Sequence, residues 1–405
     1  MFRYLCVFVV FLAAVDAEAQ VDKSFAELFD APKTSESTLS QVRQLQKRAK
    51  DACEEDTKQL KARLKSVHRQ LKQLSANESE TRADLHEQIA TLEQAIRNQL
   101  RECDHDVPSR FAIELAKARL TDQWPKQREQ TVLASRHGAA EKRKHGDVDD
   151  IGYRNVGGGL EGQSRDLPTG SQAMRQMKAS GMMPAEIQDA GVQRYVEHLA
   201  RSIASHSDLR IPLSVTVLES NDIDAMGLPG GFLFVTSGLL RACESEDELA
   251  GVIAREIAHI AARHGAQHSK RSFISKILVP AARVAAGVFV GGPVNAGAYY
   301  GLNYGFQGLQ SIVDRTLTGS SDAAQKEADQ LGIQYAWNAG FDPKGFIQFL
   351  DSLAKRREFS RTESWFQLKP SLDKRLMDAF TEIQYLPVRD HSSSNSADFQ
   401  SVLKR

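Results

Sequence analysis

Two stretches in the N-terminal part of the chain repeat apolar residues in alternating steps of four and three, with polar residues between them. The repeated residues are Leu60, Leu64, Val67, Leu71 and Leu74 in the first stretch and Leu85, Ile89, Leu92 and Ile96 in the second. This spacing places the apolar side chains on one stripe of a helix, as in a coiled-coil seam. Folding the segment about Glu78 pairs the two stripes, so the sequence predicts an antiparallel helical hairpin over residues 40–106.

Two cysteines continue the register of this seam. Cys53 and Cys103 each lie one heptad beyond a seam residue, and folding about Glu78 brings them opposite each other. We therefore expect a disulfide at the open end of the hairpin, with Cys243 remaining reduced. The alternative is a single solvated helix with two unrelated thiols. A hairpin of this kind carries no chemistry of its own and is interpreted as a spacer, a lid or a partner-binding arm.

The hydrophobic pattern changes again after the hairpin. Residues 107–175 are polar and glycine-rich with few apolar anchors, which predicts a linker. A periodic core follows over residues 176–385, where "LSVTVLE" and "GGFLFVT" predict strands. In the same core "SEDELAGVIAREIAHIAARHG" predicts a long helix with Ser245 as its N-cap and Gly265 as its end. Residues 386–405 predict a polar tail.

The N-terminus has the layout of a secretory signal. Arg3 precedes an apolar run that is too short to span a bilayer, and Ala17-Glu18-Ala19 provides a cleavage site of small residues. We expect residues 1–19 to be a signal peptide and the mature chain to be periplasmic or secreted.

Two further features bear on partners. The chain has 52 basic and 52 acidic residues, a balance that gives no indication of a nucleic-acid partner. Residues 276–302 are apolar but are interrupted by proline, arginine and glycines, so we interpret them as a mobile apolar loop capable of peripheral membrane contact. Insertion of this segment into a membrane is the alternative.

The long helix carries a near match to a zinc-protease motif. In His-Glu-x-x-His, two histidines on one helix face bind zinc and the glutamate activates the metal-bound water. Here the sequence reads Arg255-Glu256-Ile257-Ala258-His259. Glu-x-x-His is weak evidence alone, because an acidic residue three positions before a histidine is common on helices. The surrounding sequence supplies the specificity.

Four stretches follow one another in the order and approximate spacing of one family: "NDIDAMGLPGGFLFVTSGLL", "SEDELAGVIAREIAHIAARHG", "QKEADQLGIQYAWNAGFDPKGF" and "LKPSLDKRL". The chain from about Pro184 to Ala379 resembles the zincin metallopeptidases of family 48, which include CAAX prenyl proteases, HtpX and BepA, and in particular their exported BepA-like branch. The resemblance implies a mostly helical α+β fold, a zincin-like domain with a small edge β-sheet, preceded here by the hairpin. It also implies a zinc cofactor and protein substrates.

The family's site residues map onto this chain one by one. The general base falls on Glu256 and the second histidine ligand on His259, whereas the first histidine ligand falls on Arg255. The third ligand, a glutamate, falls on Gln325. The family's auxiliary arginine persists as Arg375, while a histidine near the C-terminus falls on Lys369. The family's substrate-pairing edge strand corresponds to Pro229, Gly230, Gly231, Phe232 and Phe234.

These replacements remove most of the metal site. A guanidinium stays protonated and offers only hydrogen-bond donors, and a glutamine lacks the charge that helps to neutralise zinc. We expect Arg255 to pair instead with Glu256 or Glu327. On a helix, Glu327 points about 200° away from Gln325, and His264 and His268 are expected on another face than His259. Zinc, expected for the family, is therefore predicted to be absent or weakly bound.

Three functions remain open. The first is an exported pseudopeptidase that binds protein or peptide clients in a chaperone or assembly role. The second is an active zinc metalloendopeptidase with a rearranged metal site. The third is a structural protein whose hairpin mediates homo-oligomerisation or contacts an envelope assembly partner.

Overall fold

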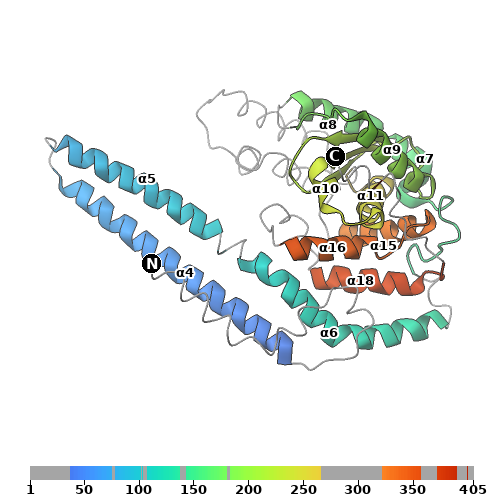
Figure 1. Cartoon of the computed structure of the whole chain (residues 1–405), viewed down its shortest axis with the longest axis horizontal. Helices are drawn as coiled ribbons and strands as arrows, with labels where there is room; N and C mark the ends of the chain where they lie inside the picture. The colour runs from blue at the N-terminus through green and yellow to red at the C-terminus, as the bar shows by residue number, and fades with distance from the viewer. Residues whose placement is uncertain are drawn as a thin grey trace. The chain divides into compact units, whose positions relative to one another are not determined.

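The computed structural model describes residues 37–74, 78–101, 103, 107–136, 143–179, 183–265, 322–356, 372–389 and 399. The predicted signal peptide, the apolar segment 276–302, His268 and Lys369 lie outside the described residues. The described residues divide into two compact units, one within residues 33–122 and the other within residues 123–405. Figure 1 shows the elements of both units.

The first unit contains the hairpin, formed by α4 (Ser37–Gln73) and α5 (Ser79–Arg101) (Figure 1). The reversal lies at the predicted position, because α5 begins directly after Glu78. All seam residues except Ile96 form one apolar cluster, in which Val67, Leu85 and Leu92 are buried and the other members, Leu60, Leu64, Leu71, Leu74 and Ile89, are partly buried. Burial of the facing apolar stripes of α4 and α5 therefore holds the two helices together.

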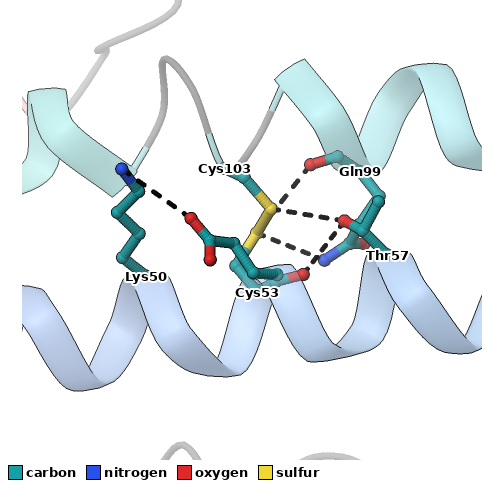
Figure 2. Close-up of a disulfide and its surroundings, with 6 residues drawn as sticks. Lys50, Cys53, Thr57, Gln99 and Cys103 are labelled. Atoms are coloured by element: carbon teal, nitrogen blue, oxygen red, sulfur yellow. Dashed lines mark hydrogen bonds and ion pairs between the residues drawn. A yellow bond between two sulfur atoms is a disulfide. The ribbon is translucent and has the colours of Figure 1, made fainter.

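A disulfide joins the two helices of the hairpin at its open end (Figure 2). The Sγ atoms of Cys53 and Cys103 are 2.02 Å apart, and the two Cα atoms are 5.6 Å apart. Gln99 Nε2 donates to Cys53 Sγ at 3.4 Å, and Phe111 packs against the pair. Cys243 is a buried thiol of the second unit and is not part of the disulfide.

The region predicted as a linker is instead largely helical. It contains α6 (Val107–Arg136), a short 3-10 turn η2 (Val156–Gly158), α7 (Gly159–Ser164) and the beginning of α8 (Leu167–Ala179). Gln163 shows why the polar composition was misleading. Its buried side-chain amide donates to Val156 O, Asp208 O and Ala261 O at 3.3, 3.0 and 3.1 Å. Polar residues of this region therefore hold the fold through inward hydrogen bonds rather than facing solvent as linker residues do.

The second unit contains a three-stranded sheet made of β1 (Ser214–Leu218), β2 (Ala225–Leu228) and β3 (Phe232–Thr236). The strand order is β1-β3-β2, with β1 parallel and β2 antiparallel to β3. Gly230 and Gly231 connect β2 to β3 with φ values of 84° and 85°, a left-handed conformation that favours glycine. The glycines of the family's motif therefore lie in this turn, and strand β3, which follows it, is the middle strand of the sheet.

The second unit also contains the helices α9 (Ala190–Ser205), α10 (Ser237–Ala242), α11 (Glu246–Ala261), α15 (Asp322–Asn338), α16 (Gly345–Arg356) and α18 (Leu372–Tyr385). Helices α9, α10 and α11 contact the sheet, whereas α15 and α16 pack against α11 and α18 packs against α15. Every residue of α11 is buried, so this helix is the centre of the unit (Figure 1). Ser245 caps it by accepting from Glu248 N at 3.2 Å, as predicted, but the helix ends at Ala261 rather than near Gly265. The mostly helical α+β prediction is confirmed. Among the helices described, none is long and apolar enough to cross a bilayer.

Candidate functional site

The candidate site lies where three helices of the second unit meet. Helices α11 and α15 approach closely because Gly332 has no side chain: a Cβ there would lie 2.8 Å from Arg255 Cα. This contact places the predicted site residues of both helices beside each other, and α18 adds an arginine. The residues brought together are Arg255 and Glu256 from α11, Gln325 and Asp329 from α15, and Arg375 from α18.

Arg255 is 5% exposed, and its guanidinium occupies the centre of this group. Its Nη1 donates to Glu256 Oε1 at 2.7 Å, and its Nε donates to Asp329 Oδ1 at 2.8 Å. Its Nη2 donates to Gln325 Oε1. Two of the three positions to which the resemblance assigns metal ligands are therefore bonded directly to each other, as an arginine donor and a glutamine acceptor.

Asp329 neutralises two arginines at once. Arg375 donates to it through Nε at 2.7 Å and Nη2 at 2.9 Å, while Arg255 shares its Oδ1. Burial acts to raise the pKa of Asp329, but the charges of Arg375 and Arg255 outweigh burial and hold that pKa below its ordinary value. Two arginines and two carboxylates thus form a charge-balanced buried network, in which each carboxylate has a cationic partner.

Both carboxylate oxygens of Glu256, the residue to which the resemblance assigns the general base, accept hydrogen bonds. Oε1 accepts from Arg255, and Oε2 accepts from Gly227 N of strand β2 at 3.0 Å. Burial raises the pKa of Glu256, and the charge of Arg255 together with the Gly227 hydrogen bond acts in the opposite direction. The carboxylate therefore links α11 to the sheet.

These residues do not fit a zinc ion at the family's position. Arg255 offers only donors and would hold a positive charge beside the metal. The carbonyl oxygen of Gln325 already accepts from that arginine. His259 alone is a single ligand, whereas structural and catalytic zinc sites use at least three protein ligands. Over the described part of the chain, no group of three or more His, Cys, Asp or Glu side chains is arranged to hold a metal ion.

A second polar cluster, which was not predicted from the sequence, begins at His259. His259 Nδ1 and His264 Nδ1 are 3.0 Å apart, and His264 Nε2 lies 3.3 Å from Glu327 Oε2. Glu327 Oε1 also contacts His145 Nε2 and Lys144 Nζ, each at 2.7 Å. Burial acts to raise the pKa of Glu327, but hydrogen bonds from His145, His264 and Lys144 hold that pKa well below its ordinary range.

The expected position of His264 is wrong for a local reason. Helix α11 ends at Ala261, and Arg263 has a left-handed φ of 60°, so the chain turns back and brings His264 against His259. An ion pair between Arg263 and Asp166, at 2.7 and 2.8 Å, holds this turn. Burial, followed by the charge of Arg255 and then that of His264, lowers the pKa of His259 well below its ordinary value, so its imidazole is neutral.

Of the residues assigned to substrate binding, Pro229, Gly230 and Gly231 lie in the turn between β2 and β3, and Phe232 and Phe234 lie in the sheet but not at its edge. Phe232 and Phe234 belong to β3, which has a partner strand on both sides. Phe234 is 1% exposed and packs with Met177 of α8. Helix α8 also approaches Pro229 so closely that a Cβ on Gly170 would lie 1.6 Å from Pro229 O. The expectation that this strand offers a free edge to substrate is therefore wrong, and strand β2 takes the edge position.

Comparisons with known proteins agree with this domain. The sequence profile described as Peptidase family M48 matches residues 186–382. Two relatives named beta-barrel assembly-enhancing protease are similar: that of Yersinia pestis is 28% identical over 247 residues (58% of this chain, 47% of the relative), and that of Escherichia coli is 27% identical over 227 residues (53% and 43%). The mitochondrial metalloendopeptidase OMA1 of Schizosaccharomyces pombe is 29% identical over 176 residues (43% and 47%). The chain spans about half the length of these relatives or less.

Proposed function

Because residues 186–382 match the model of peptidase family M48, we propose that this chain is a peptidase-like protein of that family that binds protein or peptide clients without hydrolysing them. One observation carries the proposal. Arg255 stands in the position of the family's first metal ligand and bonds to Glu256, Gln325 and Asp329. A positive charge that is bonded to the general base takes the place of the cation on which the family's hydrolysis depends.

The nature of the clients follows from the relatives. Relatives in the comparison are named as proteases of β-barrel assembly or as endopeptidases, so their printed names refer to protein substrates or partners. We propose protein or peptide clients for this chain on that basis. The signal-like residues 1–19 support a periplasmic or secreted location, and hence clients in the same compartment.

Among the residues that the structure describes, the sheet has one edge without a partner strand. The outer side of β1 is occupied by residues 185–187, since Ile187 N donates to Val217 O at 2.9 Å and Glu219 N donates to Ala185 O at 2.8 Å. The remaining edge is β2, where Gly227 N donates to Glu256. An extended client that pairs with β2 by main-chain hydrogen bonds would therefore compete with the Glu256 carboxylate.

Two matched variants test both parts of this proposal. Glu256→Gln and Glu256→Ala both remove the charge, but only glutamine keeps an acceptor for Gly227 N. We expect the wild-type protein and both variants to bind labelled, reduced casein, measured by fluorescence anisotropy, and to leave it intact on gels. Glu256→Ala should bind more tightly than Glu256→Gln if β2 is the client edge. Equal affinities would exclude pairing at β2, and cleavage that depends on Glu256 would exclude the non-hydrolytic function.

A second candidate is an active metallopeptidase with a rearranged site. The approach of His264 to His259, with Glu327 behind His264, is the observation that favours it. If this site is active, the wild-type protein should cleave casein and the His264→Ala variant should cleave it more slowly. If the wild-type protein does not cleave casein, this candidate is excluded.

A further inference from the structure

The half of helix α4 nearest the hairpin turn is strongly basic. Residues 57–73 contain six lysines and arginines and no acidic residue, although the whole chain is balanced at 52 basic and 52 acidic residues. The other half differs, because Asp51, Glu54, Glu55 and Asp56 accompany its basic residues. The charge is therefore concentrated on one part of one helix.

Four of these residues lie on one face, which we call the basic stripe: Lys61, Lys65, Arg69 and Lys72. Their spacing of four, four and three keeps them aligned along a helix, about 17 Å from first to last. At about 100° per residue they point roughly 100–180° away from the seam centred on Leu60, Leu64, Val67 and Leu71, which faces α5. All four side chains are exposed.

The hairpin does not neutralise this stripe. Among the residues described, none of the four forms an ion pair within the hairpin. Glu80, Asp84 and Glu87 of α5 are also exposed and form no ion pair with the stripe in the described part of the chain. The apolar seam and the disulfide fix α4 against α5, so the four charges are presented together on a rigid rod.

We propose that the basic stripe docks the hairpin onto a surface of anionic lipid headgroups. Clusters of four to eight Lys and Arg on a helix bind such surfaces through summed attraction to many phosphates. The core of a stable protein interface needs aromatic or aliphatic side chains as well. The stripe has none: within the described hairpin the only exposed large apolar residue is Leu100, near the opposite end of the helices. A fluid surface of lipid phosphates attracts the charged side chains of the basic stripe, and this attraction requires no apolar centre in the stripe.

A charge-matched pair of full-length variants tests this proposal. The test variant changes Lys61, Lys65, Arg69 and Lys72 to Gln. The control changes the same number of charges in the other half of α4, at the exposed residues Arg43, Lys47, Arg48 and Lys50. Binding is measured by co-sedimentation with vesicles of phosphatidylcholine alone and of phosphatidylcholine mixed with phosphatidylglycerol. Circular dichroism and non-reducing mass spectrometry establish that each variant keeps its helices and its disulfide.

We expect the wild-type protein to bind the mixed vesicles and to lose that binding as salt is added, because screening weakens exposed charges. Each basic residue near an anionic surface strengthens binding by about fivefold. Removing four of them should therefore weaken binding of the test variant by roughly several hundredfold, and the control should bind within a few-fold of wild type. Equal losses in the two variants, or wild-type binding that does not need phosphatidylglycerol, would overturn the proposal. So would a stripe that binds soluble polyaspartate but no vesicle, since its partner would then be an acidic protein.

Discussion

Arg255 Nη1 lies 2.7 Å from Glu256 Oε1, so the residue in place of a metal ligand is the ion-pair partner of the residue in place of the general base. The same guanidinium reaches Asp329 and Gln325 of α15. One buried cation thus joins α11 to α15.

Removing that cation is expected to destabilise the domain strongly. Arg255→Met leaves Glu256 without its cationic partner and leaves Asp329 with Arg375 alone. Removing one partner of a buried ion pair lowers the free energy of unfolding by about 3–5 kcal/mol. Urea denaturation of the wild-type and variant proteins measures the loss. Arg165→Met is the control, because its ion pair with Glu161 is exposed and such pairs contribute about 0–1 kcal/mol. A loss for Arg255→Met no larger than that of the control would show that the network is not structural.

Restoring both family ligands is expected to create a zinc site. Arg255→His with Gln325→Glu would place two imidazoles and a carboxylate around an open position, the ligand set of catalytic zinc sites. We expect about one zinc per chain in the double variant after dialysis. Each single variant should bind poorly, because two protein ligands rarely compete with buffer. A folded double variant that takes up no zinc would show that the arrangement of α11 and α15 has diverged as well as the residues.

The free energy of unfolding should fall at low pH partly because of Asp329. Its pKa is lower in the folded protein than the ordinary value of 3.8. The folded state therefore binds fewer protons than the unfolded state between these two pKa values, so stability rises with pH there. The contribution is complete above the unfolded pKa and is lost as pH falls through the folded pKa.

Asp329→Asn should accordingly flatten the dependence of unfolding free energy on pH below about 4. Denaturation curves across that range measure the effect. Asp378→Asn serves as the control, because Asp378 forms a more exposed ion pair with Lys326. An unchanged slope in Asp329→Asn would mean that other carboxylates dominate acid unfolding.

The disulfide is expected to stabilise the hairpin independently of the second unit. Cys53 and Cys103 are separated by 50 positions, and closing a loop of that length stabilises by about 4 kcal/mol in the chain-entropy model. Replacing both cysteines with serine should increase the rate of amide hydrogen exchange in α4 and α5 by the factor that corresponds to this loss of free energy. Cys243→Ala should leave exchange in the hairpin unchanged. Equal exchange in the presence and absence of the disulfide would show that the seam alone holds the hairpin.

The sequence predicted the hairpin well because all the information is local. The two apolar stripes and the two cysteines belong to one segment with one reversal, so a single register places every pair. The linker prediction failed because the fold of that region depends on distant partners. Gln163 is buried only because Asp208 and Ala261 supply carbonyl oxygens for its amide. Composition alone does not show such pairs.

The site was predicted in part. The replacements at Arg255 and Gln325 follow from the motif, and pairing of Arg255 with Glu256 is present in the structure. The expectation named Glu327 as the other candidate acid, but Asp329 is the one that Arg255 contacts. Spacing offered the signal, since residues four apart share a helix face and Asp329 lies four positions after Gln325. No comparable signal marked His264, because its place depends on a left-handed turn after the helix.

The zinc content of wild-type protein, purified without added metal, decides whether Arg255 has replaced the cation of the family. We expect far less than one zinc per chain by mass spectrometry of the metal, unchanged by a chelator, and no loss of folded structure on chelation. Stoichiometric zinc that a chelator removes, with casein cleavage that disappears together with the metal and in Glu256→Gln, would contradict a non-hydrolytic role.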